Sequence, residues 1–102
     1  MNIDADIQVW LETMNRNQAA VIVPYVQSKQ DKTLAYAVRA VKEGPNGRSV
    51  LSQGGTLRVP ANVPTALGRM SLSWGKQDDC GIDLKLSENG AAQRNYHFAC
   101  PE

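Results

Sequence analysis

Two cysteines, one histidine and one pair of adjacent aspartates are the residues of this 102-residue chain whose side chains could support covalent, acid–base or metal chemistry. Cys80 and Cys100 are too far apart for a redox Cys-x-x-Cys motif. His97 stands alone, and Asp78-Asp79 lacks further ligands at a metal-binding spacing. The chain has no Gly-x-Ser-x-Gly motif and no phosphate-binding glycine loop. The sequence therefore predicts that the protein is not an enzyme, holds no metal and needs no cofactor.

The two cysteines gain a role from the strand pattern around them. Apolar residues alternate from Cys80 to Leu86 and again from Ala92 to Cys100. A loop centred on Gly90 places the apolar side chains of both strands on one face, pairing Ile82 with Phe98, Leu84 with Tyr96 and the cysteines with each other. A register shifted by two residues keeps the same faces and stays open. Opposed cysteines have the Cα separation of a disulfide, which predicts a Cys80–Cys100 bond and an oxidising compartment such as the periplasm. Two reduced cysteines in a cytosolic protein are the alternative.

The alternation that positions the cysteines runs through most of the chain. Apolar side chains recur with the period of two that is typical of strands, and few segments have the 3.6-residue period of a helix. Turn signals separate these segments, and the densest of them is Glu43–Gly47. We expect about seven antiparallel strands, within residues 7–12, 19–26, 34–41, 56–59, 70–74, 80–87 and 92–100.

This spacing of strands and turns predicts an all-β fold, an immunoglobulin-like two-sheet β-sandwich. Because the chain has no linker and no repeat, residues 1–102 are expected to form a single domain. Pro24 cannot donate to a sheet ladder, so its strand is expected at a sheet edge or at a bulge. Gly54-Gly55 indicates a break between strands. The two prolines within 59–64 favour an extended crossover between the sheets.

Charge is distributed unevenly, although the net charge is only +1. Residues 32–76 contain seven cations and a single carboxylate, Glu43, whereas the flanking segments are acidic. In a sandwich the middle strands are neighbours, so several of these cations could share one positive face that attracts an acidic partner. The alternative is that the charges only keep the surface hydrated and discourage aggregation. The cations expected on this face are Lys32, Arg39, Lys42, Arg58 and Arg69, with Arg48 and Lys76 peripheral.

Other classes of partner find little support in the sequence. The longest apolar run, Ala19–Val23, is far shorter than the roughly 20 residues of a membrane helix, so no membrane partner is expected. A net charge of +1 without an aromatic–basic motif argues against nucleic-acid binding. Trp10 and Trp74 could form a sugar-binding platform, although we expect tryptophans on alternating strands to be core residues.

Two segments of the middle region resemble a known family. Residues 42–49, Lys-Glu-Gly-Pro-Asn-Gly-Arg-Ser, precede a stretch at 56–72 that contains Pro-Ala-Asn-Val-Pro-Thr-Ala-Leu at residues 60–67. This combination is similar to the CsgC/CsgH family of periplasmic curli assembly proteins, and looks closest to its CsgH branch. The resemblance covers about residues 24–88. The Cys-x-Cys motif of the CsgC branch would fall near Lys32 and Leu34, so a redox role tied to that motif is not expected here.

The resemblance implies a periplasmic, chaperone-like inhibitor of amyloid formation by curli subunits. We expect a monomer that binds an acidic, strand-forming curli subunit through transient, electrostatically guided contacts and so blocks nucleation. The chain does not begin with a signal-peptide pattern, as expected of the mature form of an exported protein. The alternative function is a passive structural, adhesion or carbohydrate-binding module of an extracellular assembly.

Overall fold

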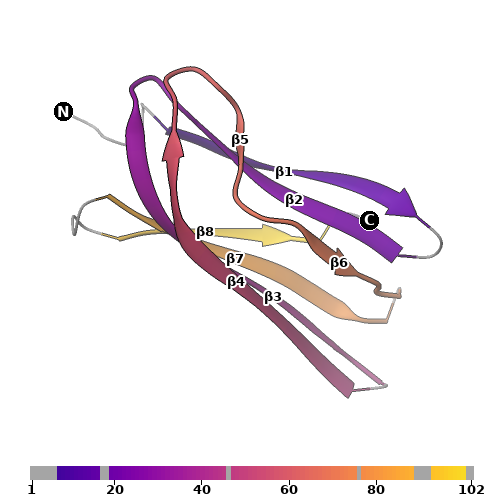
Figure 1. The fold of residues 1–102 in the computed structure, drawn as a ribbon. Coiled ribbons are helices and arrows are strands. Elements are labelled where there is room, and N and C mark those ends of the chain that lie inside the picture. Colours follow the sequence, from indigo (N-terminus) through magenta and orange to yellow (C-terminus); the bar gives the residue numbers. More distant parts are fainter. Residues whose placement is uncertain (1–6, 17–18, 46, 76, 89–92, 101–102) are drawn as a thin grey trace.

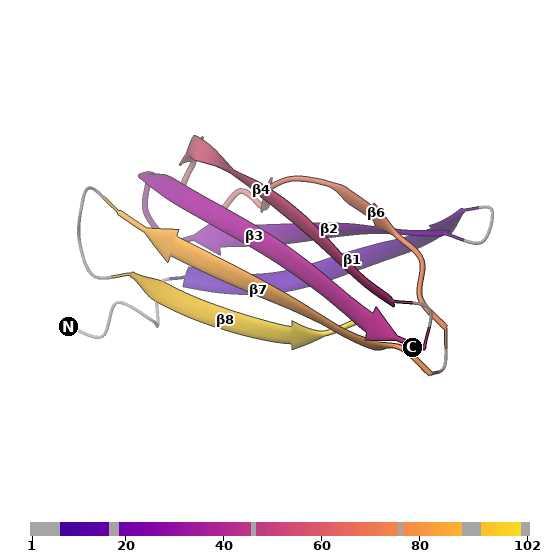
Figure 2. The same cartoon turned by 90° about the horizontal axis from the view of Figure 1, so that it is seen from below.

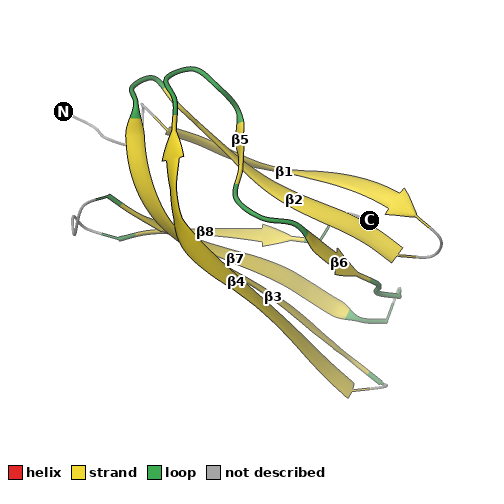
Figure 3. Cartoon of the chain, in the orientation of Figure 1, coloured by secondary structure: helices red, strands yellow, loops and turns green. Residues whose placement is uncertain are grey.

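Two β-sheets packed face to face form the structure, a computed structural model that describes residues 7–16, 19–45, 47–75, 77–88 and 93–100 (Figures 1 and 3). The described residues form eight strands, against the expected seven or so. None of the described segments is a helix long and apolar enough to cross a membrane. The strands are Ile7–Arg16 (β1), Ala19–Ser28 (β2), Lys32–Gly44 (β3), Gly47–Val59 (β4), Thr65–Ala66 (β5), Met70–Leu72 (β6), Asp79–Ser87 (β7) and Arg94–Ala99 (β8).

The strand order defines the sandwich. Sheet A has the order β1-β2-β5, with β6 also paired to β2, and sheet B has the order β4-β3-β7-β8 (Figure 2). All of these strand pairs are antiparallel. The order of sheet B matches that of the C′-C-F-G strands in variable-type immunoglobulin domains. The prediction of an all-β, immunoglobulin-like two-sheet sandwich is confirmed.

The core lies between the sheets and follows the alternation of each strand. On β3, Leu34, Val38 and Ala40 expose at most 1% of their surface, whereas Ala35, Ala37 and Arg39 between them are exposed. The even-numbered residues 82–86 of β7 are buried in the same way. Burying an aliphatic side chain of this size contributes about 1.5–3 kcal/mol. Because a one-residue shift would expose a whole row of these side chains, burial sets the register of both strands.

Pro24 lies inside sheet A, so the prediction of an edge position is wrong. β2 is flanked by β1 on one side and by β5 and β6 on the other. The C=O of Pro24 accepts a hydrogen bond from the N–H of Leu67 at 2.8 Å, and the β6 ladder begins one residue out of step with this pairing. As a result, Gly68 and Arg69 both lie opposite Val23. The bulge is therefore present on the neighbouring segment, and the absent N–H of the proline faces this interruption.

β4 runs through Gly54-Gly55 without interruption, so the predicted break there is wrong. Gly55 pairs with Tyr36, and a Cβ added at Gly55 would lie 3.5–3.7 Å from atoms of the tyrosine side chain. An aromatic side chain that covers a cross-strand glycine supplies packing that the glycine lacks. The strand therefore extends over 13 residues. It begins in the expected hairpin turn, where Gly44 pairs with Gly47 and Gly47 has a φ of 119°.

Residues 60–64 form the expected crossover from sheet B to sheet A, but the segment is not extended throughout, because the N–H of Val63 donates to the C=O of Pro60 at 3.3 Å and closes a turn. The N–H of Asn62 donates to the C=O of Ser28 at 2.6 Å, and the N–H of Ala61 donates to Oδ1 of Asp31 at 2.7 Å. These bonds tie the crossover to the end of β2 and to the residue that precedes β3. Asn62 has a φ of 63°, a conformation that asparagine adopts more readily than most residues.

Candidate functional site

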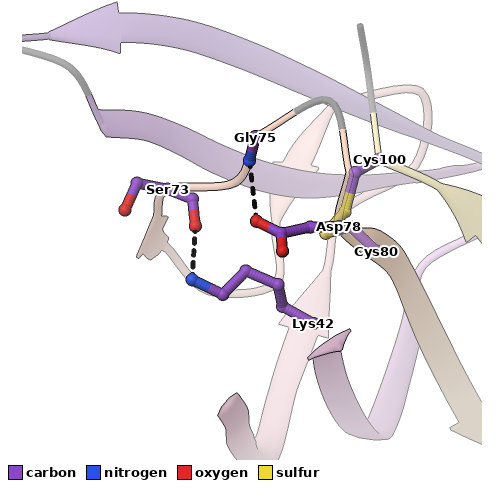
Figure 4. The surroundings of a disulfide bond; sticks show 6 residues. All are labelled: Lys42, Ser73, Gly75, Asp78, Cys80 and Cys100. Atoms are coloured by element: carbon purple, nitrogen blue, oxygen red, sulfur yellow. Dashed lines mark hydrogen bonds between the residues drawn. A yellow bond between two sulfur atoms is a disulfide. The ribbon is translucent and has the colours of Figure 1, made fainter. Parts of the chain in front are cut away.

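The C-terminal strand pair has the predicted register and the predicted disulfide. Ile82 pairs with Phe98, and the other apolar pairs across β7 and β8 follow the same register. Cys80 and Cys100 are joined by a disulfide, with their Cα atoms 5.3 Å apart (Figure 4). The N–H of Cys100 also donates to the C=O of Cys80 at 3.1 Å. These pairings exclude the register shifted by two residues, while the predicted loop centre, Gly90, lies outside the described residues.

Polar side chains hold the loop between β6 and β7 beside the disulfide. Oδ2 of Asp78 accepts a hydrogen bond from the N–H of Gly75 at 2.8 Å, and Nζ of Lys42 donates to the C=O of Ser73 at 2.8 Å (Figure 4). Trp74 lies between these two contacts in the sequence and packs against the core, as expected. Among the described residues, no group of three or more His, Cys, Asp and Glu side chains could hold a metal ion. Asp78 therefore has a structural role in the turn.

Lys32 and Lys42 lie on the inner side of sheet B. Both share the parity of the buried residues of β3. Nζ of Lys32 lies 2.8 Å from Oε2 of Glu88, and the Lys32 side chain is only 10% exposed. Lys42 is engaged with the β6–β7 loop. These two ammonium groups therefore brace the two ends of β3, and neither lies on the outer face of the sheet.

Arg39 and Arg58 lie on the outer face of sheet B, because they have the opposite parity. Arg39 is placed between Ser52 on β4 and Asp83 on β7. Nη2 of Arg58 is 3.8 Å from Oδ2 of Asp31, and these two side chains are 75% and 61% exposed. An exposed ion pair of this kind contributes at most about 1 kcal/mol. The Arg58 guanidinium therefore remains accessible to other carboxylates.

Arg69 lies outside sheet B, in the bulge between β5 and β6, and beside β4. Nε2 of Gln53 donates to the C=O of Arg69 at 2.7 Å, and the N–H of Arg69 donates to Oε1 of Gln53 at 3.2 Å. Arg69 is exposed. The structure therefore does not gather the five predicted cations on one wall: two lie on the outer face of sheet B, one lies beside β4, and two face inward.

The outer face of sheet B also carries charged and titratable side chains that the predicted set omitted, among them Asp83, Lys85 and His97. Lys85 on β7 is exposed and lies opposite Ala37 on β3. Nδ1 of His97 is 2.6 Å from Oδ1 of Asp83, and both side chains are exposed. The alternation of β7 already indicated this placement, since Asp83 and Lys85 occupy the positions between its buried residues.

The free side of β4 is the most extended exposed strand edge of sheet B. β4 is an end strand of this sheet, and the residues from Gly47 to Thr56 are exposed apart from the half-buried Leu51. We call the free side of β4 from Gly47 to Arg58 the β4 margin. Nε of Arg48 is 3.4 Å from Oε1 of Glu43, again between exposed side chains. The arginines in or next to this margin are Arg39, Arg48, Arg58 and Arg69.

Trp10 lies on the outer face of sheet A, so its predicted place in the core is wrong. Its ring stacks on that of Tyr25, with the ring centroids 5.6 Å apart and an interplanar angle of 9°. Its Nε1–H donates to Oε2 of Glu12 at 3.1 Å. One face of the indole and its N–H group are thus already engaged, and this arrangement gives no support to a sugar-binding platform.

Sequence comparison assigns this β-sandwich to a class of fimbria-building proteins. The chain matches the Tafi-CsgC family model, described as thin aggregative fimbriae synthesis protein, over residues 3–96. The curli assembly protein CsgC of Escherichia coli K12 is 30% identical over 81 residues, which cover 79% of this chain and 74% of that protein. The CsgC of Salmonella typhimurium LT2 is 26% identical over 81 residues, covering 79% and 75% of the two chains. The chain belongs to the CsgC family, which gives it a role in curli assembly.

Solved structures agree with this assignment. The E. coli curli protein CsgC, in its SeCys form, superposes with a TM-score of 0.78 at 26% identity, covering 90% of this chain and 97% of that one. The solution structure of R. palustris CsgH gives a TM-score of 0.73 at 17% identity, with 91% of each chain covered, and so shares the fold. Resemblance to the CsgC/CsgH family is confirmed, although the higher identity with CsgC does not favour the CsgH branch. Membership of a family of assembly proteins also agrees with the prediction of a non-enzymatic protein.

Proposed function

We propose that this protein is a periplasmic, chaperone-like inhibitor that, as a monomer, keeps a curli subunit from nucleating amyloid. The observation that carries the proposal is the exposed, arginine-flanked β4 margin on a rigid sandwich of the CsgC family. Amyloid subunits polymerise by adding strands to unpaired strand edges. A protein that occupies such a strand transiently competes with nucleation and needs no ATP.

The exposed fractions of the predicted cations support different roles for the arginines and the lysines. Arg39, Arg58 and Arg69 are exposed and can attract an acidic client, whereas Lys32 and Lys42 have fixed partners on the inner side of sheet B. Long-range attraction of this kind accelerates encounter more than it strengthens the final complex. The contacts are therefore expected to be brief, which suits an inhibitor that acts at less than stoichiometric amounts.

The disulfide supports an export compartment. Disulfides persist in oxidising environments such as the bacterial periplasm and are rare in the reducing cytosol. The Cys80–Cys100 bond and membership of a curli assembly family both favour the periplasm, where a curli subunit would be met before secretion.

A thioflavin T time course of a purified curli subunit tests the proposal. At a small molar fraction of this protein, we expect a long extension of the lag before fibres form. An unchanged curve would overturn the proposal. Stoichiometric incorporation into the fibres without a longer lag would instead favour a passive structural module.

Neutralising exposed cations tests the electrostatic part. The double variant Arg39→Gln/Arg58→Gln is expected to lose most of the lag extension and keep its fold. The matched control, Lys32→Gln/Lys42→Gln, lowers the net charge equally, and where it folds it is expected to inhibit as well as the unmodified protein. High salt should also weaken inhibition, because the screening length falls from about 8 Å at physiological ionic strength to about 3 Å at 1 M. If both double variants lose the lag extension equally, the net charge of the protein, and not the position of the outer-face arginines, determines inhibition.

A further inference from the structure

The backbone direction of β4 follows from one hydrogen bond at the opposite side of sheet B. The N–H of Cys100 donates to the C=O of Cys80, so the backbone polar groups of Cys80 point to β8. Along an antiparallel strand, successive residues direct these groups to alternate sides. The odd-numbered residues of β7 therefore bond to β3, where they lie opposite odd-numbered residues. This leaves the even-numbered residues of β3 to bond to β4, and these lie opposite odd-numbered residues of β4. The odd-numbered residues of β4 thus bond to β3. The backbone N–H and C=O groups of the even-numbered β4 residues point away from β3, on the free side of the strand. These residues are Arg48, Val50, Ser52, Gly54, Thr56 and Arg58.

The β4 margin therefore presents a row of N–H and C=O groups to solvent. In the part of the chain that the structure describes, no strand pairs with β4 on this side. The side-chain amide of Gln53, on the inner side of the strand, forms hydrogen bonds with the backbone of Arg69. From Gly47 to Ser52 the strand is exposed apart from the half-buried Leu51, and Val50 is 43% exposed. An unpaired edge of this length is a template for another strand.

Length and charge separate this edge from the other strand edges described. β8, at the other side of sheet B, has 6 residues against the 13 of β4, and β5 and β6 have 2 and 3. β1 has 10 residues, and its formal charges, Glu12 and Arg16, cancel. β4 contains Arg48 and Arg58 and no acidic residue. Its charge complements an acidic strand and opposes a basic one.

We infer that the β4 margin binds an extended, acidic segment of the curli subunit as an additional strand of sheet B. This inference rests on the proposed function and specifies how the client is held. Main-chain hydrogen bonds from even-numbered β4 residues give affinity, and the side chains around the margin select carboxylates on the segment: Arg39, Arg48, Arg58 and Arg69. While the segment is paired with β4, one of its edges is occupied and cannot receive another copy of the subunit.

Replacing Val50 with proline tests the strand pairing. Val50→Pro removes an N–H that points away from the sheet, while Ser49 and Leu51 keep the bonds to β3. Proline is tolerated on edge strands in this orientation, and the extended backbone of Ser49 suits a residue that precedes proline. The matched control, Val50→Thr, keeps both the N–H and the branched shape. We expect Val50→Pro to need about fivefold more protein for the same lag extension, as the loss of one hydrogen bond implies, and Val50→Thr to match the unmodified protein.

The outcomes separate the strand pairing from the proposed function. If the unmodified protein does not delay fibre formation, the proposed function fails and the inference falls with it. If Val50→Pro is folded and inhibits as well as the unmodified protein, strand pairing is overturned while the proposed function stands. Circular dichroism and the intact disulfide report whether Val50→Pro is folded.

Amide exchange of the unmodified protein gives a test that no substitution can confound. In the free protein, the amides of Val50 and Ser52 should exchange rapidly and those of Ser49 and Leu51 slowly. Adding the curli subunit under conditions that delay its assembly should slow exchange at Val50 and Ser52. Unchanged exchange at these two amides during active inhibition would overturn the inference.

Discussion

The two end strands of sheet B are treated in opposite ways. β8 is short and is locked to β7 by the Cys80–Cys100 disulfide, whereas β4 is more than twice as long, bears no covalent restraint and exposes most of its residues. Free strand edges invite pairing with other chains, so proteins usually cover, shorten or charge them. Here one end strand of the sheet is short and covalently restrained, and the other is long, exposed and flanked by arginines. The difference indicates that β8 serves stability and that β4 is available for contact.

Removing the disulfide should have the largest effect on stability and none on function. The double variant Cys80→Ala/Cys100→Ala frees a loop with a sequence separation of 20 residues. By the chain-entropy estimate, we expect the free energy of unfolding to fall by about 3 kcal/mol, measured by urea denaturation. At temperatures where the variant is folded, its extension of the curli-subunit lag should be unchanged. Reduced inhibition by the folded variant would mean that the β8 side also takes part in binding.

Releasing the β4 margin from sheet A should have an intermediate effect on the free energy of unfolding. Gln53→Leu removes the two hydrogen bonds to the backbone of Arg69. Since this contact is exposed, we expect a loss of about 1 kcal/mol in unfolding free energy and faster amide exchange at Arg69. Ser52→Ala, one residue away and with no such contact, is the control and should leave both values unchanged. Equal exchange at Arg69 in the two variants would show that the clamp does not hold this segment in solution.

Disrupting the contact between His97 on β8 and Asp83 on β7 should have the smallest effect on the free energy of unfolding. Their side chains are 69% and 51% exposed, so the 2.6 Å contact is well solvated. We expect His97→Gln to change the unfolding free energy by less than about 0.5 kcal/mol at neutral pH. A loss comparable with that of the disulfide variant would show that β8 depends on this pair as well as on its covalent bond.

Much of the fold was predictable because local signals agree with the tertiary structure. The alternation of residues 80–86 and 92–100 specified a shared face, which restricted the β7–β8 register to shifts of two residues, and the structure selected the register that opposes the two cysteines. The same kind of signal could have divided the cations, since Lys32 and Lys42 share the parity of Leu34 and Val38 while Arg39 does not. Counting the charges in residues 32–76 did not reveal this division, because such a count ignores which side of a strand each residue occupies.

Other features depended on residues that are distant in the sequence. Gly54-Gly55 indicates a break when viewed alone, but Tyr36 covers Gly55 from the neighbouring strand. Pro24 indicates an edge strand, but the irregularity lies on a partner segment more than 40 residues away. Glycine and proline signals describe local backbone preferences, and packing against a partner strand can outweigh them.

The amino-acid sequence alone was enough to predict a β-sandwich and a disulfide between two neighbouring strands, because side-chain alternation is a local property of each strand. Only the tertiary structure decided which cations remain accessible. Lys32 meets Glu88 across 56 positions, and Arg69 reaches β4 through Gln53, contacts that exist only once the strands are ordered into sheets. The open side of β4 was decided in the same way, because a strand edge is free or paired according to which strands lie next to it.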